Sequence, residues 1–221
     1  MALEQAFILM MAVSVVIGYL LGSINFGVVV SKGLYHEDVR TKGSGNAGTT
    51  NILRTYGKKA AALTLAGDMA KGAVAVWLCH WGVAALTGAD VNGVYAGYLA
   101  AIGAVCGHLW PIWFGFKGGK GIAVAAGAIL ASEPVVLLAL LVVFFAIALT
   151  TRIVSLASVT VAILYPILTL LWSWWYTQRS LLFTGVCTVL MAVLVVWMHR
   201  ANIQRLLNGT EYRFGEKKKD E

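Results

Sequence analysis

Long apolar stretches are the feature that most constrains what this chain can fold into. Of its 221 residues, 59% are hydrophobic and only 12% are charged, and the mean hydropathy is +0.79. A transmembrane helix needs about 20 mainly apolar residues, and the clear candidates are 5–30, 60–86, 93–114, 155–175 and 180–198. This composition excludes a soluble globular protein. It predicts an all-α polytopic membrane protein with one domain over residues 1–221 and a short disordered basic tail at about 214–221.

The segment 121–150 is longer than a single span needs. Ser132-Glu133-Pro134 interrupts it, because proline cannot continue a helical hydrogen-bond ladder and glutamate is unfavourable in hydrocarbon. The segment is therefore either one long kinked helix or two helices, at 121–131 and 134–150.

The distribution of cations favours two helices. With the N-terminus outside, the cytoplasmic face then receives 31–59, 115–120, Thr151-Arg152 and the tail from His199, so nearly every lysine and arginine lies inside. We therefore predict seven transmembrane helices, with the N-terminus outside and the C-terminus cytoplasmic. The helix at 121–131 reaches only about 17 Å at 1.5 Å per residue. It must be tilted, lie in a thinned bilayer, or begin from a loop that dips into the membrane.

The net charge and the cysteine content limit which ligands and partners we expect for this chain. The net charge is +7, but the cations sit mostly in short loops and in the tail, which is the positive-inside pattern and not a nucleic-acid groove. Cys79, Cys106 and Cys187 stand singly in apolar stretches, so we expect no disulfide, no metal and no cofactor. The N-terminus lacks the basic region of a secretory signal, which predicts a retained first span.

Two glycine-rich loops carry the strongest functional signal. Residues 43–51 are followed by Arg54, and residues 115–121 contain Lys117 and Lys120. Glycines let backbone N–H groups approach an anion, the cations add charge, and a following helix contributes its positive dipole end. The expected ligand is a phosphate. The ordinary alternative is that the glycines only make turns and the lysines only set topology.

Several polar residues lie in or beside the apolar stretches. Asp68 and Lys71 are three residues apart on one predicted helix face, so they form either a site pair or a structural ion pair. His108 precedes the second loop, where it either satisfies a carbonyl freed by a nearby proline or touches substrate. His199 and Asn202 can face one spot on a continuing helix, although His199 could equally cap a helix end.

No standard hydrolase or nucleotide-binding motif is present. The predicted cytoplasmic face combines cations, amides, hydroxyls and one imidazole, with few carboxylates. Such a set stabilises anions and an oxyanion better than it supplies general bases.

An ordered series of motifs makes the chain resemble one family. The series is Gly22-Ser23-Ile24-Asn25-Phe26-Gly27, Gly43-Ser44-Gly45-Asn46 through Thr50-Asn51 to Arg54, Gly67-Asp68 with Lys71-Gly72, Gly107-His108 through Pro111 to Lys117-Gly118-Gly119-Lys120-Gly121, Thr151-Arg152 with Ser155, and His199-Arg200 with Asn202-Ile203. This series resembles the bacterial acyl-phosphate:glycerol-3-phosphate acyltransferases, the PlsY family. The similarity runs through most of the chain.

The resemblance implies a seven-span protein of the bacterial inner membrane with its active site at the cytoplasmic face. It implies transfer of a fatty acyl group from acyl phosphate to the 1-hydroxyl of sn-glycerol 3-phosphate. The products would be lysophosphatidic acid and inorganic phosphate, in the first step of phospholipid synthesis. The expected partners are these two substrates and the lipid bilayer, with no nucleic acid and with functional coupling to an enzyme that forms acyl phosphate.

The resemblance also assigns site residues by matching position. The expected catalytic residues are Ser44, Lys120, Ser155, His199 and Asn202. The expected substrate-binding residues are Ser23, Asn46, Asn51, Arg54, His108, Lys117, Gly118, Gly119 and Gly121.

Two questions about mechanism and class stay open from the sequence. We expect no covalent acyl-enzyme, because neither serine has an evident adjacent base and acyl phosphate is already activated. The proton acceptor is either a substrate phosphate oxygen or His199. Competing classes are a transporter or channel for a phosphorylated metabolite and a lipid-anchoring scaffold with basic loops.

Overall fold

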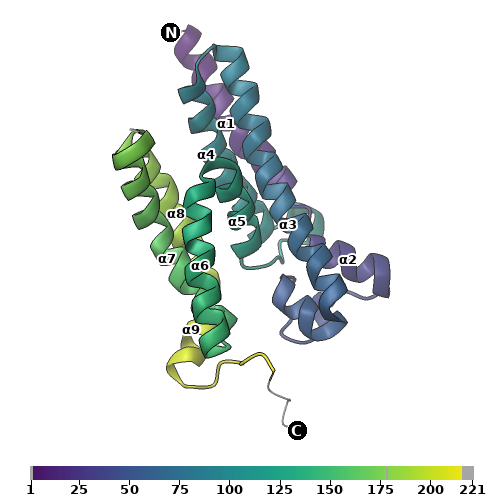
Figure 1. Ribbon diagram of the computed structural model, residues 1–221. Coiled ribbons are helices and arrows are strands. Elements are labelled where there is room, and N and C mark those ends of the chain that lie inside the picture. Colours follow the sequence, from purple (N-terminus) through teal and green to yellow (C-terminus); the bar gives the residue numbers. More distant parts are fainter. Residues whose placement is uncertain (1, 178, 216–221) are drawn as a thin grey trace. The chain divides into compact units, whose positions relative to one another are not determined.

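The computed structural model describes residues 2–177 and 179–215, and within those ranges the chain is helical with no strand (Figure 1). It forms two compact units, 1–134 and 135–221, which are described separately. The first contains the helices α1 (Ala2–Gly22), α2 (Phe26–Tyr35), α3 (Thr49–Thr87), α4 (Asp90–Leu109) and α5 (Ile122–Ser132), with 3₁₀ turns η1 (Val39–Thr41) and η2 (Ile112–Phe114). The second contains α6 (Pro134–Thr151), α7 (Val154–Trp172), the π-helical turn η3 (Ser173–Thr177), α8 (Leu181–Met198) and α9 (Arg200–Leu207).

Six helical stretches are long and apolar enough to cross a membrane. They are Glu4–Tyr35, Thr49–Thr87, Asp90–Phe114, Pro134–Thr151, Val154–Thr177 and Leu181–Met198. The 11-residue α5 is apolar but shorter. An all-α membrane protein is thus confirmed, while the seventh span, the orientation of the termini and the single domain over 1–221 stay predictions. Most of the predicted tail, residues 216–221, lies outside the described residues.

The division of 121–150 into two helices is confirmed. Helix α5 ends at Ser132 and α6 begins at Pro134. The Glu133 side chain between them is buried and accepts a hydrogen bond from the Tyr98 hydroxyl of α4. Its carboxyl group therefore has a hydrogen-bond partner inside the first unit, which lowers the free-energy cost of burying it. One continuous kinked helix is the wrong alternative.

The first predicted span, 5–30, falls within the apolar stretch Glu4–Tyr35, which is long enough to cross a membrane, but it is not one continuous helix, because α1 ends at Gly22 and α2 begins only at Phe26. The Asn25 side chain accepts a hydrogen bond from the amide of Val28 at 3.2 Å and so caps α2. The carbonyl of Ile24 accepts a hydrogen bond from Lys71 Nζ at 2.7 Å. The break is thus stabilised by a local cap and by a lysine from α3.

The second predicted span also starts earlier than expected. Helix α3 begins at Thr49 rather than near residue 60, and it bends at Gly57, whose φ of 84° lies in the left-handed region. Only glycine adopts such backbone readily. The bend joins the first glycine-rich loop to the long apolar part of α3.

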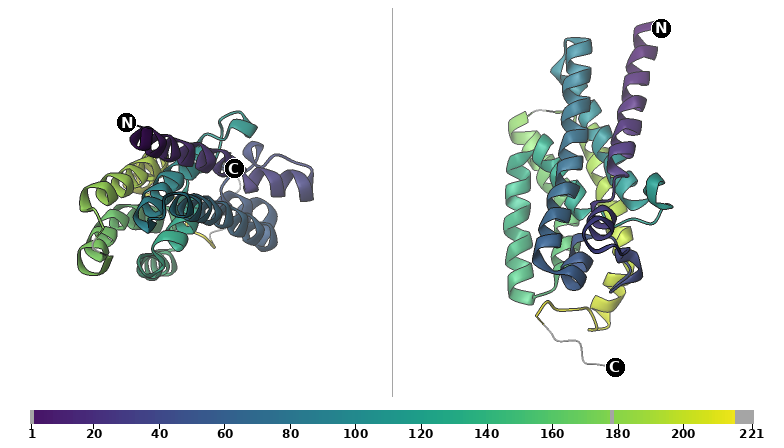
Figure 2. Two further views of the ribbon diagram at one scale, coloured as in Figure 1. Left: turned by 90° about the horizontal axis from the view of Figure 1, so that it is seen from above. Right: turned by 90° about the vertical axis from the view of Figure 1, so that its right-hand side faces the viewer.

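Close contacts at glycines hold the first unit together. Its helices pack against one another, α1 against α4 and α3 against α4 and α5 (Figures 1 and 2). A Cβ added at Gly18 or Gly22 of α1 would overlap a carbonyl oxygen of α4, and one at Gly103 or Gly107 of α4 would overlap a carbonyl oxygen of α1. Helices α3 and α5 approach in the same way at Gly72 and Gly127. Small residues at helix crossings are the usual means by which membrane helices gain van der Waals contact.

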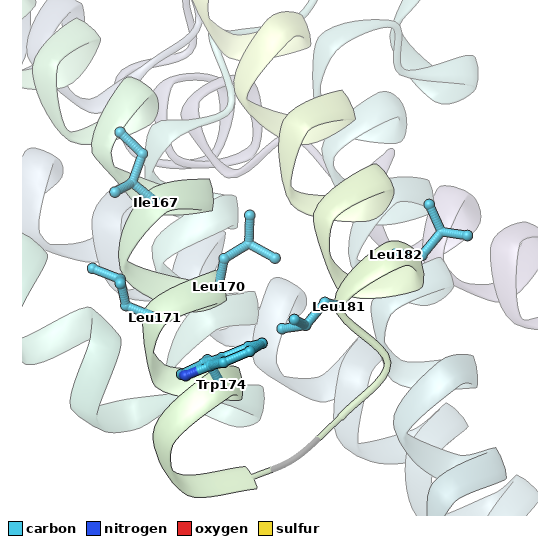
Figure 3. A pocket seen from close by; sticks show the side chains of 6 residues that line it. All are labelled: Ile167, Leu170, Leu171, Trp174, Leu181 and Leu182. Atoms are coloured by element: carbon cyan, nitrogen blue, oxygen red, sulfur yellow. The ribbon is translucent and has the colours of Figure 1, made fainter.

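The second unit contains an apolar pocket of about 620 Å³ near the end of α7 and the start of α8. Figure 3 shows its lining side chains, Ile167, Leu170, Leu171, Trp174, Leu181 and Leu182. None of them carries a charge. Ser155 lies near the opposite end of α7, roughly 18 Å away at 1.5 Å per residue, so this pocket is not the predicted phosphate site.

Candidate functional site

The first glycine-rich loop is built around Asn51. Its Nδ2 donates to the carbonyls of Val39 (3.2 Å), Lys42 (3.0 Å) and Asn46 (2.9 Å), while its Oδ1 accepts from the amide of Ser44 at 2.9 Å. The side chain is buried. Asn51 therefore shapes the loop with all its polar atoms, and its predicted contact with substrate stays untested.

The same loop exposes the Ser44 side chain between two left-handed glycines, Gly43 and Gly45. Asn46 Oδ1 accepts a hydrogen bond from the amide of Gly48 at 2.9 Å, directly before α3 begins. Arg54 follows in the first turns of α3 and is also exposed. Ser44 and Arg54 are thus presented at the surface, whereas Asn46 serves the loop itself.

The second loop folds back on the end of α4. The amide of Gly118 donates to the carbonyl of Leu109 at 3.2 Å, and that of Gly119 donates to the carbonyl of His108 at 3.1 Å. A Cβ at Gly118 would overlap the His108 carbonyl oxygen, and one at Gly119 would overlap the His108 imidazole at Nε2. Gly121, with φ of 89°, then precedes α5. Glycine is needed here for close approach to α4.

This geometry restricts the expectation that the loop amides bind an anion, because several of them already have acceptors in the protein. The loop amides were expected to face an anion, but those of Gly118 and Gly119 donate to α4, that of Gly45 donates to the Lys42 carbonyl, and that of Gly48 donates to Asn46. These four amides donate within the protein because backbone N–H groups away from water need acceptors. The side chains remain as the candidate ligands: Lys117 is exposed and Lys120 is half-buried.

Asp68 and Lys71 form the predicted ion pair, with Nζ and Oδ1 2.7 Å apart. Lys71 Nζ also lies 2.9 Å from His108 Nδ1 and donates to the Ile24 carbonyl. His108 Nδ1 is 3.5 Å from Asp68 Oδ1, and all three side chains are buried. His108 is thus part of an ionic cluster and does not satisfy a proline-freed carbonyl. The cluster joins the α1–α2 break, α3 and α4, and through the His108 ring it contacts the second loop at Gly119.

Ser23 lies at the end of α1 and is buried. Its hydroxyl donates to the Tyr19 carbonyl at 2.8 Å and accepts from the Ile112 amide at 3.4 Å. The hydroxyl therefore has structural partners, and its predicted binding role is untested.

Arg40 is a residue that the sequence analysis missed. Its Nη1 donates to the carbonyls of Phe114 at 2.6 Å and Lys117 at 3.1 Å, and its Nε and Nη2 donate to Asp38. The hydrogen bond from Arg40 outweighs partial burial and lowers the pKa of the Asp38 carboxyl to about 2. This pair connects the segment before the first loop to the second loop. The sequence analysis singled out neither residue of this pair.

In the second unit, Ser155 and Asn202 meet at Glu211, another residue that was missed. Ser155 Oγ donates to Glu211 Oε1 at 2.8 Å, Asn202 Nδ2 donates to the same oxygen at 2.6 Å, and Arg205 Nε donates to Oε2 at 2.7 Å. The Glu211 side chain is only 5% exposed. Burial alone would raise its pKa, but the hydrogen bonds from Asn202, Ser155 and Arg205 outweigh burial and lower it.

His199 occupies the junction of α8 and α9, so the expected continuous helix is wrong at this residue. The ring is buried, and its Nδ1 lies 2.7 Å from the Val195 carbonyl. A carbonyl can only accept, so Nδ1 carries the proton that is donated. In a neutral ring Nε2 is then the acceptor, as a general base requires.

The predicted site residues therefore form two groups. Ser23, Ser44, Asn46, Asn51, Arg54, His108, Lys117, Gly118, Gly119, Lys120 and Gly121 belong to the first unit, and Ser155, His199 and Asn202 belong to the second. Within residues 2–177 and 179–215, no group of three or more histidine, cysteine, aspartate or glutamate side chains could hold a metal ion.

Comparison with known proteins places these features in a family. Residues 12–209 match the family model described as glycerol-3-phosphate acyltransferase. A glycerol-3-phosphate acyltransferase of Clostridioides difficile is 44% identical over 92% of this chain and 95% of its own, and one of Ralstonia pickettii is 46% identical over 91% and 92%.

Two solved structures of PlsY (YgiH), an integral membrane glycerol 3-phosphate acyltransferase, are also similar. The glycerol 3-phosphate form is 36% identical with a TM-score of 0.78 and covers 93% of this chain and 96% of its own. The lysophosphatidic acid form is 35% identical with a TM-score of 0.76, at 93% and 95% coverage. The similarity thus extends over nearly the whole length of both partners, and this chain belongs to the glycerol-3-phosphate acyltransferase family, PlsY.

Proposed function

We propose that this protein transfers a fatty acyl group from acyl phosphate to the 1-hydroxyl of sn-glycerol 3-phosphate, giving lysophosphatidic acid and inorganic phosphate. The observation that carries the proposal is the similarity over 93% of the chain to a PlsY structure in a glycerol 3-phosphate form. The reaction would begin phospholipid synthesis at the cytoplasmic face of a bacterial inner membrane. Seven spans with the N-terminus outside would place both glycine-rich loops and His199 on that face.

The cations of the first unit suit substrates that both carry phosphate. Arg54, Lys117 and Lys120 would bind phosphate groups, and Ser44 would donate a hydrogen bond to them. Ser155 would do the same only after it gives up the hydrogen bond that its hydroxyl donates to Glu211. His199 and Asn202 would orient glycerol 3-phosphate. The acyl chain would stay in the lipid while its phosphate reaches the loops.

The chemistry requires attack of the glycerol hydroxyl oxygen on the acyl carbonyl carbon. The new C–O bond forms, the bond to the phosphate oxygen breaks, and the hydroxyl proton leaves with a base. Lysines near the phosphate would stabilise the charge that develops on the leaving group. The proton acceptor is either a phosphate oxygen of the substrate or His199 Nε2. The hydrogen bond from Nδ1 to the Val195 carbonyl supports the histidine as a competent acceptor.

The decisive experiment is phosphate release by the purified, detergent-solubilised protein given palmitoyl phosphate, with and without sn-glycerol 3-phosphate. We expect release only with both substrates, and at least a tenfold loss in Lys120→Ala. Replacing palmitoyl phosphate by palmitoyl-CoA tests the donor, and we expect no product. Absence of release while glycerol 3-phosphate still binds would contradict the proposal and favour transport.

A further inference from the structure

Arg40 links the segment just before the first glycine-rich loop to the second glycine-rich loop. It lies in η1, just before the first loop, and its Nη1 reaches the carbonyls of Phe114 and Lys117 on either side of the turn that opens the second loop. These contacts cross more than 70 residues of sequence and all lie within the first unit. Arg40 therefore affects where the second loop lies relative to the first.

Asp38 fixes the direction of the guanidinium group. Its Oδ1 accepts from Arg40 Nε at 2.9 Å and its Oδ2 accepts from Nη2 at 2.7 Å, which is the bidentate geometry that arginine makes and lysine cannot. Oδ1 also accepts from the Arg40 backbone amide at 3.0 Å. With Nε and Nη2 occupied, Nη1 is directed towards the second loop.

The turn that Arg40 holds has an unfavourable backbone. Gly115 and Phe116 both adopt left-handed conformations, with φ of 66° and 58°, and a side chain such as phenylalanine disfavours this region. Such a conformation persists only where its surroundings support it. Arg40 donates hydrogen bonds to the carbonyls of Phe114, before the turn, and of Lys117, directly after it.

We propose that Arg40 is a positioning residue that sets the separation between the cations of the second loop and Ser44 of the first, and thereby the affinity for glycerol 3-phosphate. The inference rests on the proposed function. Four of the five guanidinium N–H groups have acceptors in the protein, so Arg40 acts through the loops and not as a phosphate ligand.

The test compares Arg40→Gln and Arg40→Lys with Lys59→Gln, a loss of charge at an exposed position of α3. In steady-state kinetics we expect both Arg40 variants to raise KM for glycerol 3-phosphate about tenfold, with kcat changed less than about threefold, because misplaced binding groups weaken affinity. Arg40→Lys keeps the positive charge but loses the planar guanidinium group that donates two hydrogen bonds to Asp38. Lys59→Gln should match the unmodified protein.

Hydrogen exchange supplies a readout that needs no turnover. The amides of residues 112–119 should exchange at least tenfold faster in Arg40→Gln, whereas those of α1 and α4 should not change. The double variant Asp38→Asn/Arg40→Gln should be no worse than Arg40→Gln alone, since the two side chains act as one unit.

Three results would overturn the inference. The first is full function in Arg40→Lys, and the second is an equal fall in kcat and kcat/KM with unchanged exchange, which would place Arg40 at the reacting groups. The third is unaltered exchange in Arg40→Gln. If the unmodified protein itself shows no acyl transfer, the proposed function fails, and the exchange experiment still decides whether Arg40 holds the loop.

Discussion

The two groups of site residues are held in place by different physical means. In the first unit, several backbone amides of the glycine-rich loops and the Asn51 side chain form hydrogen bonds that shape the loops, whereas the side chains of Ser44, Arg54 and Lys117 lie at the surface. In the second unit, Ser155 and Asn202 are buried and share a single carboxylate oxygen of Glu211. The first group therefore depends on steric fit, and the second depends on one buried charge.

The largest effect should come from breaking the steric fit. Gly119→Ala would place a methyl group against the rigid His108 ring, so we expect the loop to shift and kcat/KM for acyl transfer to fall by about 100-fold or more. Gly33→Ala is the control, because nothing lies within 4 Å of a Cβ at that position. Activity of Gly119→Ala within threefold of the control would show that the loop tolerates displacement.

The next effect should come from the second unit. His199→Asn keeps a donor in the position of Nδ1 but removes Nε2, so we expect kcat to fall about 100-fold with KM for glycerol 3-phosphate changed only a few-fold, if Nε2 accepts the proton. The measurement is a steady-state analysis at saturating palmitoyl phosphate. A fall in kcat of less than about tenfold would favour a substrate phosphate oxygen as the acceptor.

A smaller effect should follow from neutralising the buried charge. Glu211→Gln places an amide donor where the carboxylate accepted hydrogen bonds from three side chains. We expect it to lower the stability of the second unit by about 1–3 kcal/mol and kcat/KM by about tenfold. A thermal unfolding experiment measures the change in stability, and an acyl-transfer assay measures the change in kcat/KM. Glu4→Gln, on the exposed start of α1, should change neither.

The smallest effect is expected from mild acid. The pKa of Asp38 is lowered to about 2, so its bond to Arg40 contributes stability fully above the ordinary pKa near 4 and loses it as pH falls towards 2. The pKa of Glu211 is also lowered, so its hydrogen bonds likewise lose their contribution to stability only as the pH falls. Between pH 8 and 5, exchange at residues 112–119, corrected for intrinsic rates, should stay constant. Faster exchange already at pH 6 would mean that another group titrates in this contact.

What the sequence predicted of the fold depended on how local the signal was. The break at Glu133-Pro134 was predictable because both residues disfavour a helix in lipid where they stand. The break after Gly22 was not, because part of its stabilisation comes from Lys71, 47 residues away. The early start of α3 was missed because the bend at Gly57 has no hydrophobic signature.

The same distinction applies to the site. The family resemblance identified Ser155 and Asn202, which meet at Glu211, but the sequence analysis did not single out Glu211 itself. The glycine amides at 118 and 119 were assigned to a ligand because a sequence does not show which carbonyl is nearby. Their acceptors, at His108 and Leu109, become visible only when the loop folds back.

The glycines at the contact between α1 and α4 also have a consequence for how the sequence can evolve. Every single-base change that converts a glycine codon into another amino acid adds at least a Cβ atom. At Gly18, Gly22, Gly103 and Gly107 that atom would meet the backbone of the facing helix, which has no rotamer by which to move aside. No single-base substitution that replaces glycine at these four codons is therefore expected to be neutral. We expect the spacing of the two helices to change more slowly in evolution than the lipid-facing surface around them.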